Sequence, residues 1–349
     1  IFNEIDTDSI NINVWMDWVA SDDPRTMYQI PSSGQVVNTF PTKTFRLPVD
    51  KQAVLKSGVV ALKDQAKIVP YIDVTIKDEV IYKNRLLMLD IIANNNWQRP
   101  IYFSGGSFGD DDYLWMKDYL QMDGVVYKLV PIKTPVDKDN PFDMGRVDAD
   151  KSYEIVKNWD WGNSGDPAVY HDIETRRNGL TYRSNLARIA EALLKENKLD
   201  KAREILDLAM EKMPVDTFAF YSLLEPYMQM YYSVNQPEKA RDIYAQLAVV
   251  YQEKLLYFSS FKTNEQIDMR REIYTDMERY RAVVTVLLAE DTKEYALTEA
   301  IKFNEYIKLF PYLYNPDEGI ELQDQSALGS DTEIPAEASL QELLQSQAN

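Results

Sequence analysis

Residues 185–214, NLARIAEALLKENKLDKAREILDLAMEKMP, carry the pattern that decides the fold of the second half of the chain. Small side chains occur at Ala190, Ala202 and Ala209, and Pro214 closes the segment. These intervals of twelve, seven and five residues are typical of a tetratricopeptide repeat, in which two antiparallel helices approach closely where side chains are small. We therefore predict a helical pair here, with the proline ending its second helix.

Two further helical pairs are predicted after this one. A looser copy contains Ala240, and its additional residues are expected in the turn at 215–218. A third pair, over 266–289 and 293–310, lacks the small-residue pattern and is expected to cover the open end of the stack. Because long helical periods continue with almost no glycine, we predict an all-α, tetratricopeptide-like helical repeat domain over 169–315.

Residues 1–135 alternate between short extended runs and helical patterns, which is typical of an α+β or mixed α/β domain. Apolar side chains alternate along 10–19 and along 71–76, so we predict strands there. The apolar spacing in 84–93 predicts a helix, and 110–121 is expected to form another. The predicted fold class is therefore an α+β (mixed α/β) N-terminal domain followed by an all-α domain.

The remaining segments have the composition of connections. Residues 136–168 combine proline and glycine with charged side chains, which predicts a linker with one short helix. Residues 316–349 hold eight acidic residues and no lysine or arginine, and an exposed acidic tail is favoured over a docking peptide. The sequence begins with Ile1 rather than methionine and shows no signal peptide, so we expect a piece of a longer protein.

Composition excludes several classes of site. The 349 residues include no cysteine and one histidine, so disulfides, thiolate zinc sites and histidine-rich metal sites are not expected. The net charge of -18 is a poor match to a phosphate backbone, and no nucleic-acid partner is expected. No stretch approaches the roughly 18 apolar residues of a membrane span. The sequence also predicts no cofactor.

Two acidic segments are weak candidates for calcium. Asp110, Asp111 and Asp112 follow a glycine-rich turn, where their charge would repel a phosphate group at the helix start. A structural turn is favoured there, with a calcium site as the alternative. Residues 137–148 begin like a calcium-binding loop but have Phe142 where that loop requires glycine.

No catalytic residue is predicted. The only histidine, His171, precedes Asp172, but no G-x-S-x-G motif supplies a nucleophile, so a structural role is favoured. A pair of carboxylates for glycoside hydrolysis is left open, because 56 acidic residues offer many pairs and only geometry selects one. The dense aromatic residues of 221–261 are expected to fill the helical core, although a few on a concave face would suit a peptide or a sugar.

Several segments resemble the soluble C-terminal region of a Bacteroidetes family of protein O-mannosyltransferase-like membrane proteins of the GT-C type. The segments are 45–51 (FRLPVDK), 86–103 (LLMLDIIANNNWQRPIYF), 119–132 (YLQMDGVVYKLVPI) and 161–163 (WGN), followed by the repeat-like stretch 191–214. The run NNWQRPIYF is the most specific of them. After Pro214 the resemblance is one of architecture only.

The resemblance implies a multi-pass parent that uses a lipid-linked sugar donor, with its catalytic acidic residues in loops of the membrane region. No position of this chain corresponds to those residues. The chain is then expected to be a non-catalytic module on the periplasmic side, tethered to the inner membrane. Its expected partners are its own membrane region and an acceptor protein or partner subunit bound on the helical surface. Two alternatives are a self-contained carbohydrate hydrolase that uses two carboxylates and a soluble tetratricopeptide-type scaffold.

Overall fold

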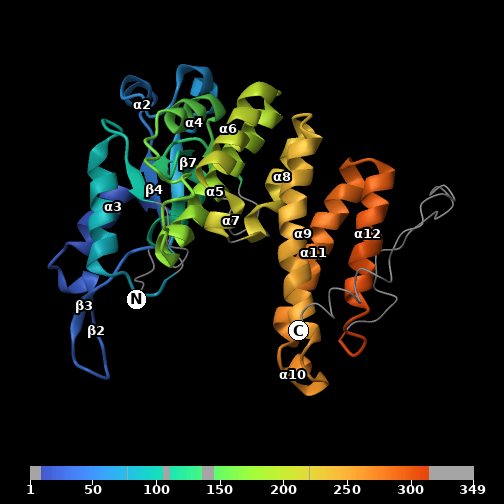
Figure 1. Ribbon diagram of the computed structural model, residues 1–349. Coiled ribbons are helices and arrows are strands. Elements are labelled where there is room, and N and C mark those ends of the chain that lie inside the picture. The colour runs from blue at the N-terminus through green and yellow to red at the C-terminus, as the bar shows by residue number, and fades with distance from the viewer. Residues whose placement is uncertain (1–8, 77, 105–110, 136–144, 220, 314–349) are drawn as a thin grey trace, which may run out of the picture. The chain divides into compact units, whose positions relative to one another are not determined.

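The computed structural model describes residues 9–76, 78–104, 111–135, 145–219 and 221–313 (Figure 1). The chain forms two compact units, residues 1–213 and residues 214–349. The described part of the first unit combines β-sheets with helices, and that of the second unit is helical. The predicted order, an α+β region followed by an all-α region, is confirmed.

The first unit contains short strands and helices of very different lengths. The strands are β1 (Ile10–Asn11), β2 (Met27–Gln29), β3 (Val36–Asn38), β4 (Thr44–Pro48), β5 (Tyr71–Thr75), β6 (Tyr102–Ser104), β7 (Leu120–Asp123), β8 (Val126–Leu129) and β9 (Arg146–Val147). The helices are α1 (Ile12–Val19), α2 (Lys51–Lys56), α3 (Lys83–Asn95), α4 (Ala149–Lys157), α5 (Ile173–Lys195) and α6 (Leu199–Lys212). Three 3-10 helices cover Pro24–Thr26, Leu62–Lys67 and Asp111–Tyr119.

Three small sheets organise this unit. The first has the order β1-β4-β5, in which β4 pairs parallel with β1 and antiparallel with β5. Strands β2 and β3 form a separate hairpin that projects from the body of the unit (Figure 1). The third sheet has the order β6-β8-β7-β9, with β9 parallel to β7 and the other pairs antiparallel. The two larger sheets therefore use strands that are distant in sequence.

Helices α1 and α3 supply apolar side chains to the core beside the first sheet. Trp15 is fully buried, and its ring centroid lies 5.7 Å from that of Phe40 and 5.6 Å from that of Phe45. The Trp15 indole N–H donates to the carbonyl oxygen of Thr42 at 3.0 Å, so the burial of this ring leaves no polar group unpaired. Leu89 of α3 is also fully buried in this core.

Two predicted elements of the first unit were wrong. Residues 10–19 form a two-residue strand and then α1, because Asn11 caps the helix and Ile12 and Trp15 bury one helical face. The predicted helix at 110–121 is a 3-10 helix followed by β7. The segment becomes extended where it pairs with β8, and Gly124, with a φ of 71°, forms the turn of that hairpin.

Helices α4, α5 and α6 belong to the first unit, so the chain divides 45 residues later than the predicted boundary at 168. Polar contacts hold them to the four-stranded sheet: Ser152 of α4 donates to the carbonyl oxygen of Met122, and Asn185 of α5 donates to that of Gly124, both at 3.2 Å. The predicted linker contains the expected short helix, which is α4, and also the strand β9, which was not predicted. These packing contacts join the first helical pair to the sheet.

Helices α5 and α6 pack against each other along the stretch with the small-residue pattern. Ala190, Ala202 and Ala209 are all fully buried. A larger side chain at these points would separate the two helices, which is the physical reason for the spacing. The structure therefore accounts for the small residues of this pair, while the wider repeat interpretation stays a prediction.

The second unit is a set of helices with an aromatic-rich core. The helices are α7 (Val215–Phe218), α8 (Glu225–Ser233), α9 (Pro237–Ser259), α10 (Thr263–Asp268), α11 (Arg270–Glu290) and α12 (Lys293–Ile307), with a 3-10 helix at Tyr221–Leu223. Helix α9 packs against both α8 and α11, and α11 packs against α12. Tyr227, Tyr231, Tyr244 and Tyr251 are almost completely buried in this core. Core packing, the favoured interpretation of these aromatic residues, is confirmed for the four.

Candidate functional site

A row of polar side chains crosses the four-stranded sheet of the first unit. Tyr102 of β6 pairs in register with Lys128 of β8, Lys128 pairs with Gln121 of β7, and Gln121 pairs with Arg146 of β9. Directly paired residues in a sheet place their side chains on the same face. The four side chains therefore line one face of the sheet, and Lys128 and Gln121 are almost completely buried there.

The Asp123 carboxylate joins this row two residues after Gln121, on the same face of β7. One of its oxygens accepts hydrogen bonds from the Lys151 ammonium group of α4 at 2.7 Å and from the Tyr102 hydroxyl at 3.2 Å. The Lys128 ammonium group lies 3.3 Å from the same oxygen. Its other oxygen accepts from the Gln121 amide at 2.8 Å. A single buried carboxylate thus receives four donors.

The charges around Asp123 do not balance, because two lysines share one carboxylate. Burial lowers the pKa of Lys128 to about 8, although the charge of Asp123 opposes this change. Burial also acts to lower the pKa of Lys151, but its hydrogen bonds with Asp123 and Lys128 raise that pKa overall. The pKa of Asp123 falls below its ordinary value because the donors from Lys151 and Gln121 outweigh the effect of burial. The cluster therefore holds an excess of positive charge.

A second acidic residue continues the network on the other side of the row. The Arg146 guanidinium donates to Gln121 at 3.2 Å and to the Asp64 carboxylate at 2.8 Å, and Lys67 donates to the other oxygen of Asp64 at 2.7 Å. Burial alone would raise the pKa of Asp64, but its hydrogen bonds with Lys67 and Arg146 lower it. A general acid in glycoside hydrolysis needs a raised pKa. Neither Asp64 nor Asp123 has one, which counts against the hydrolase alternative at this cluster.

The patterns in the sequence did not predict the polar row. Gln121 was expected at the end of a helix over 110–121, and Asp123 lies just beyond that predicted helix, so no shared strand face was predicted for the two residues. The alternation of Leu120 and Met122 with these two polar residues was the signal that predicts a strand. Only the register with β8 brings Lys128 beside them.

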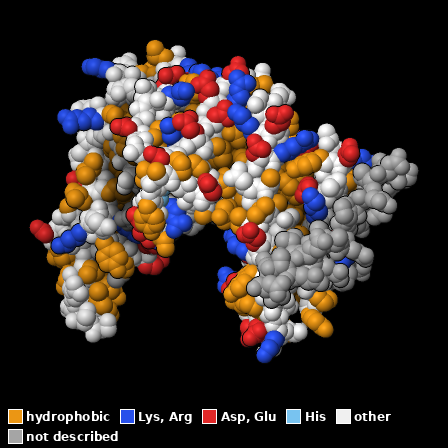
Figure 2. Space-filling view, viewed as in Figure 1, with side chains coloured by type: hydrophobic (Ala, Val, Ile, Leu, Met, Phe, Trp, Pro, Cys, Tyr) orange, Lys and Arg blue, Asp and Glu red, His pale blue; other side chains and the backbone are white. Residues whose placement is uncertain are grey.

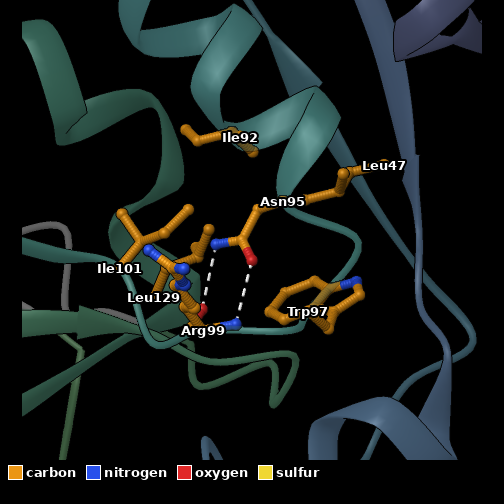
Figure 3. A pocket seen from close by; sticks show the side chains of 7 residues that line it. All are labelled: Leu47, Ile92, Asn95, Trp97, Arg99, Ile101 and Leu129. Carbon is orange, nitrogen blue, oxygen red and sulfur yellow. Dashed lines mark hydrogen bonds between the residues drawn. The ribbon is translucent and has the colours of Figure 1, made fainter. Parts of the chain in front are cut away.

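The run NNWQRP forms a tight turn that fixes the end of α3. Asn95 donates from its amide to the carbonyl oxygen of Arg99 at 2.9 Å and accepts from the Arg99 N–H at 3.1 Å (Figure 3). Asn96 and Trp97 both have left-handed backbone conformations, with φ values of 48° and 59°. The Trp97 indole donates to the carbonyl oxygen of Pro48 at 2.8 Å. These bonds stabilise a strained turn and tie it to β4.

A small pocket lies beside this turn. Its enclosed space is only about 10 Å³, and its lining residues are Leu47, Ile92, Asn95, Trp97, Arg99, Ile101 and Leu129 (Figure 3). Typical small-molecule sites occupy roughly 300–1,000 Å³ and combine apolar walls with several free polar groups. Here the Asn95 amide is already bonded to Arg99. The pocket is thus a gap in the packing around the turn and offers little to orient a ligand.

The predicted calcium candidates cannot be placed. Asp110 lies outside the described residues, and the side chains of Asp111 and Asp112 are likewise outside the described part of the structure. The segment 137–148 is described only from residue 145 onward. Among the side chains that the structure describes, no group of three or more histidine or acidic residues is arranged to hold a metal ion.

His171 lies in the loop before α5 and bonds within that loop. Its Nε2 lies 3.0 Å from the carbonyl oxygen of Ser164, and the Ser164 hydroxyl donates to the carbonyl oxygen of Lys212 at the end of α6 at 2.9 Å. Its neighbour Asp172 caps α5 by accepting from the N–H of Thr175 at 2.9 Å. These contacts agree with the favoured structural role, because they hold the loop to the ends of two helices.

The outer face of α3 exposes aliphatic side chains. Leu87 and Ile91 lie one turn apart and are 61% and 54% exposed. Val80 and Tyr82, which immediately precede the helix, are 61% and 69% exposed. Figure 2 shows hydrophobic side chains among polar ones at the surface of this part of the first unit. We call these four residues the α3 surface. None of the helices in the described ranges is long and apolar enough to cross a membrane.

Comparison with known proteins gives one similarity. No curated protein and no solved structure matches the chain. Residues 2–151 match the family model described as TMEM260-associated domain 2. The matched range includes the NNWQRP turn, the α3 surface and the whole polar row, and it ends at Lys151. In its first 151 residues the chain is therefore similar to TMEM260-associated domain 2.

Proposed function

We propose that this chain is a non-catalytic accessory module of a membrane glycosyltransferase-like protein. The match of residues 2–151 to TMEM260-associated domain 2 carries the proposal, because TMEM260 is an O-mannosyltransferase-like membrane protein. The resemblance of the NNWQRPIYF run to O-mannosyltransferase-like membrane proteins supports the same assignment. The module's task would be to hold the acceptor protein or a partner subunit beside the transferase.

A non-catalytic role is supported by how the buried ionisable groups are used. Asp64 and Asp123 each accept from two or more donors within the first unit. Asp148 caps α4 and accepts from Lys63 at 2.8 Å. Groups that are fully engaged in such pairs stabilise a fold rather than transfer protons to a substrate.

The α3 surface is the proposed contact with the transferase polypeptide. Exposed aliphatic residues one helical turn apart form the kind of stripe that a second polypeptide covers. Leu87 and Ile91 have polar neighbours in Lys83 and Asp90 on the same side of the helix, which suits an interface with an apolar centre and a polar rim. The stripe lies inside the range that matches the TMEM260-associated domain, which is the reason to assign it to this partner.

The test co-expresses the full chain, as a separate polypeptide, with the membrane region of the glycosyltransferase-like protein. The double variant Leu87→Lys and Ile91→Lys should lose co-purification with that membrane region and reduce glycan transfer to acceptor protein. The control is Leu62→Lys, because Leu62 is 70% exposed in the same unit but lies on a different element. Both changes are at exposed sites and should leave the melting temperature nearly unchanged. Unimpaired co-purification of the double variant would refute the α3 surface as the contact.

The periplasmic location and the attachment to a membrane region are parts of the same proposal. They require apolar segments of about 20 residues in the same polypeptide or in an adjacent gene. They also require that the chain become accessible to protease when the outer membrane of intact cells is permeabilised. A chain protected from protease until the inner membrane is lysed would contradict the proposed location.

A further inference from the structure

An aromatic surface lies at the end of the second unit where α9 passes into α10 (Figure 1). The ring centroid of Tyr257 lies 4.8 Å from that of Phe261 and 5.8 Å from that of Phe258, and the two phenylalanine centroids are 6.1 Å apart. Tyr257 is 60% exposed, and Phe258 and Phe261 are half-buried. We call these three residues the aromatic patch. It leaves a continuous apolar surface in contact with solvent.

The aromatic patch is held in place because α10 is fastened to the end of α9. The Gln266 amide of α10 is buried and donates to the carbonyl oxygen of Phe261 at 2.9 Å and to that of Ser259 at 3.3 Å. The Glu265 carboxylate accepts from the Lys262 N–H at 2.9 Å, which caps the start of α10. The rings are thus positioned in advance for a partner, which reduces the entropy lost on binding.

Three exposed cations next to the aromatic patch form no ion pair with any described residue. They are Lys262, Arg270 and Arg271. By contrast, Lys254, which lies one turn before the patch, pairs with Asp276 at 3.2 Å. Two exposed carboxylates, Asp268 and Glu272, also lie in this segment without an ion pair. The patch therefore suits a partner that presents apolar side chains together with a few acidic ones.

The last described helix brings the chain to the same end of the unit. The Tyr244 hydroxyl of α9 donates to Glu299 of α12 at 2.9 Å, and further along both helices Tyr251 and Tyr306 each contact the ring of Tyr280. Helices α9 and α12 therefore run in the same direction. The patch begins six residues after Tyr251, about 9 Å farther along α9. The chain after residue 313 thus starts near the patch.

The segment that follows has the matching composition. Residues 316–349 hold eight acidic residues and no lysine or arginine. Leu340, Leu343 and Leu344 have the spacing of one helical face, and Glu337 and Glu342 lie beside them in the sequence. A free coil from residue 313 to residue 340 spans about 30 Å on average, which is enough to reach the patch. An anionic bilayer is a poorer match, because the net charge of -18 repels it.

We propose that residues 336–347 dock on the aromatic patch of the same chain as an amphipathic helix. The three leucines of the segment cover the rings, and its acidic side chains lie near Arg270 and Arg271. The sequence alone favours an exposed tail, but the patch gives this segment a partner within reach, and the tether raises its local concentration to the millimolar range. The contact lies outside residues 2–151 and does not depend on the link to a glycosyltransferase.

The test measures the distance between this segment and α10 in the full chain. Because the chain has no cysteine, Asn264→Cys in α10 and Ser346→Cys provide the only attachment sites for two nitroxide labels. Double electron–electron resonance should give one narrow peak, at a distance shorter than the roughly 30 Å average of a free coil of this length. Leu340→Ser combined with Leu344→Ser should lower the equilibrium constant for docking at least tenfold and give a broad distribution.

The cations are tested by charge reversal. Arg270→Glu combined with Arg271→Glu should also give a broad distribution, because it places like charges beside the acidic segment. Lys51→Glu combined with Lys56→Glu is the matched control. These two exposed lysines of α2 likewise form no ion pair with any described residue, and the pair of changes alters the net charge by the same amount. The control should leave the narrow peak unchanged.

Several outcomes would overturn the proposal. The labelled chain gives a broad distribution, or the narrow peak survives the leucine or the arginine changes. A peak that disappears when the labelled chain is diluted with an excess of unlabelled chain would place the contact between two copies instead. A broad distribution together with binding to phosphatidylglycerol vesicles that Tyr257→Ser abolishes would assign the patch to a membrane. None of these outcomes bears on co-purification through the α3 surface.

Discussion

Replacement of Asp123 by asparagine is the most direct test of the polar row. Asparagine has nearly the shape of aspartate and keeps hydrogen-bonding atoms at both positions, but it carries no charge. The variant would leave Lys128, which is 2% exposed, and Lys151 together with no anion. The perturbation therefore isolates the charge of one carboxylate.

The structure gives the size of the expected effect. The pKa of Lys128 already lies at about 8 with Asp123 present, against an ordinary value of 10.5, and burial is the main cause. This difference corresponds to a penalty of about 3 kcal/mol for holding the charged lysine in the fold at pH 7. Removal of one partner from a buried ion pair generally lowers stability by about 3–5 kcal/mol. We expect Asp123→Asn to lower the free energy of unfolding by about that amount.

Lys128→Met is the matched control, because it removes the excess cation and leaves Asp123 with Lys151. Its stability at pH 7 should equal or exceed that of the unsubstituted chain. The two chains should also differ with pH. Between pH 8 and 10.5 the unfolded chain carries a proton on Lys128 that the folded chain has lost, so stability from this group rises with pH in that window. Lys128→Met should remove this rise.

Urea denaturation followed by tryptophan fluorescence is the suitable assay. All six tryptophans lie before residue 162, so fluorescence reports on the first unit while circular dichroism reports on both. A decrease in the free energy of unfolding of Asp123→Asn by less than about 1 kcal/mol, which is the net contribution of an ordinary hydrogen bond, would refute the assigned role of the charge. It is also refuted if Lys128→Met is destabilised as strongly as Asp123→Asn.

Two further predictions concern the helices. Ala202→Leu should lower the free energy of unfolding by about 1–3 kcal/mol in a thermal unfolding measurement, because it places a larger side chain where α5 and α6 meet. Ala245→Leu, at an exposed site of α9, is the control and should have little effect in the same measurement. The Asp291 carboxylate is 1% exposed, and the Arg241 guanidinium beside it, helped by the Tyr232 hydroxyl, lowers its pKa to about 2. The stability that this carboxylate contributes is complete above pH 4 and is lost as the pH falls toward 2. Asp291→Asn should therefore lower the free energy of unfolding by about 3 kcal/mol at pH 7. In denaturation experiments followed by circular dichroism, the variant should also lose less stability than the unsubstituted chain between pH 4 and pH 2.

Local patterns in the sequence were sufficient for much of the fold. The apolar spacing of 84–93 predicted α3, and the intervals between Ala190, Ala202 and Ala209 predicted the α5–α6 pair. These signals succeed because helical hydrogen bonds join residues four apart, so the pattern and the structure share one short period. Residues 10–19 failed because Ile12, Val14 and Met16 fit a strand while Ile12 and Trp15 fit a helix, and only burial chose between them.

The candidate sites depended on contacts that no short stretch contains. Tyr102, Lys128, Gln121 and Arg146 come from four strands, and the register of those strands brings them into one row. Tyr257 and Phe261 share one surface with the cations of 262–271 only because α10 is fastened to the end of α9. The sequence by itself determined the order of elements and the charge. The tertiary structure decided which charges are buried together and which of the described cations have no ion pair, because burial and electrostatic pairing act between residues that are distant along the chain.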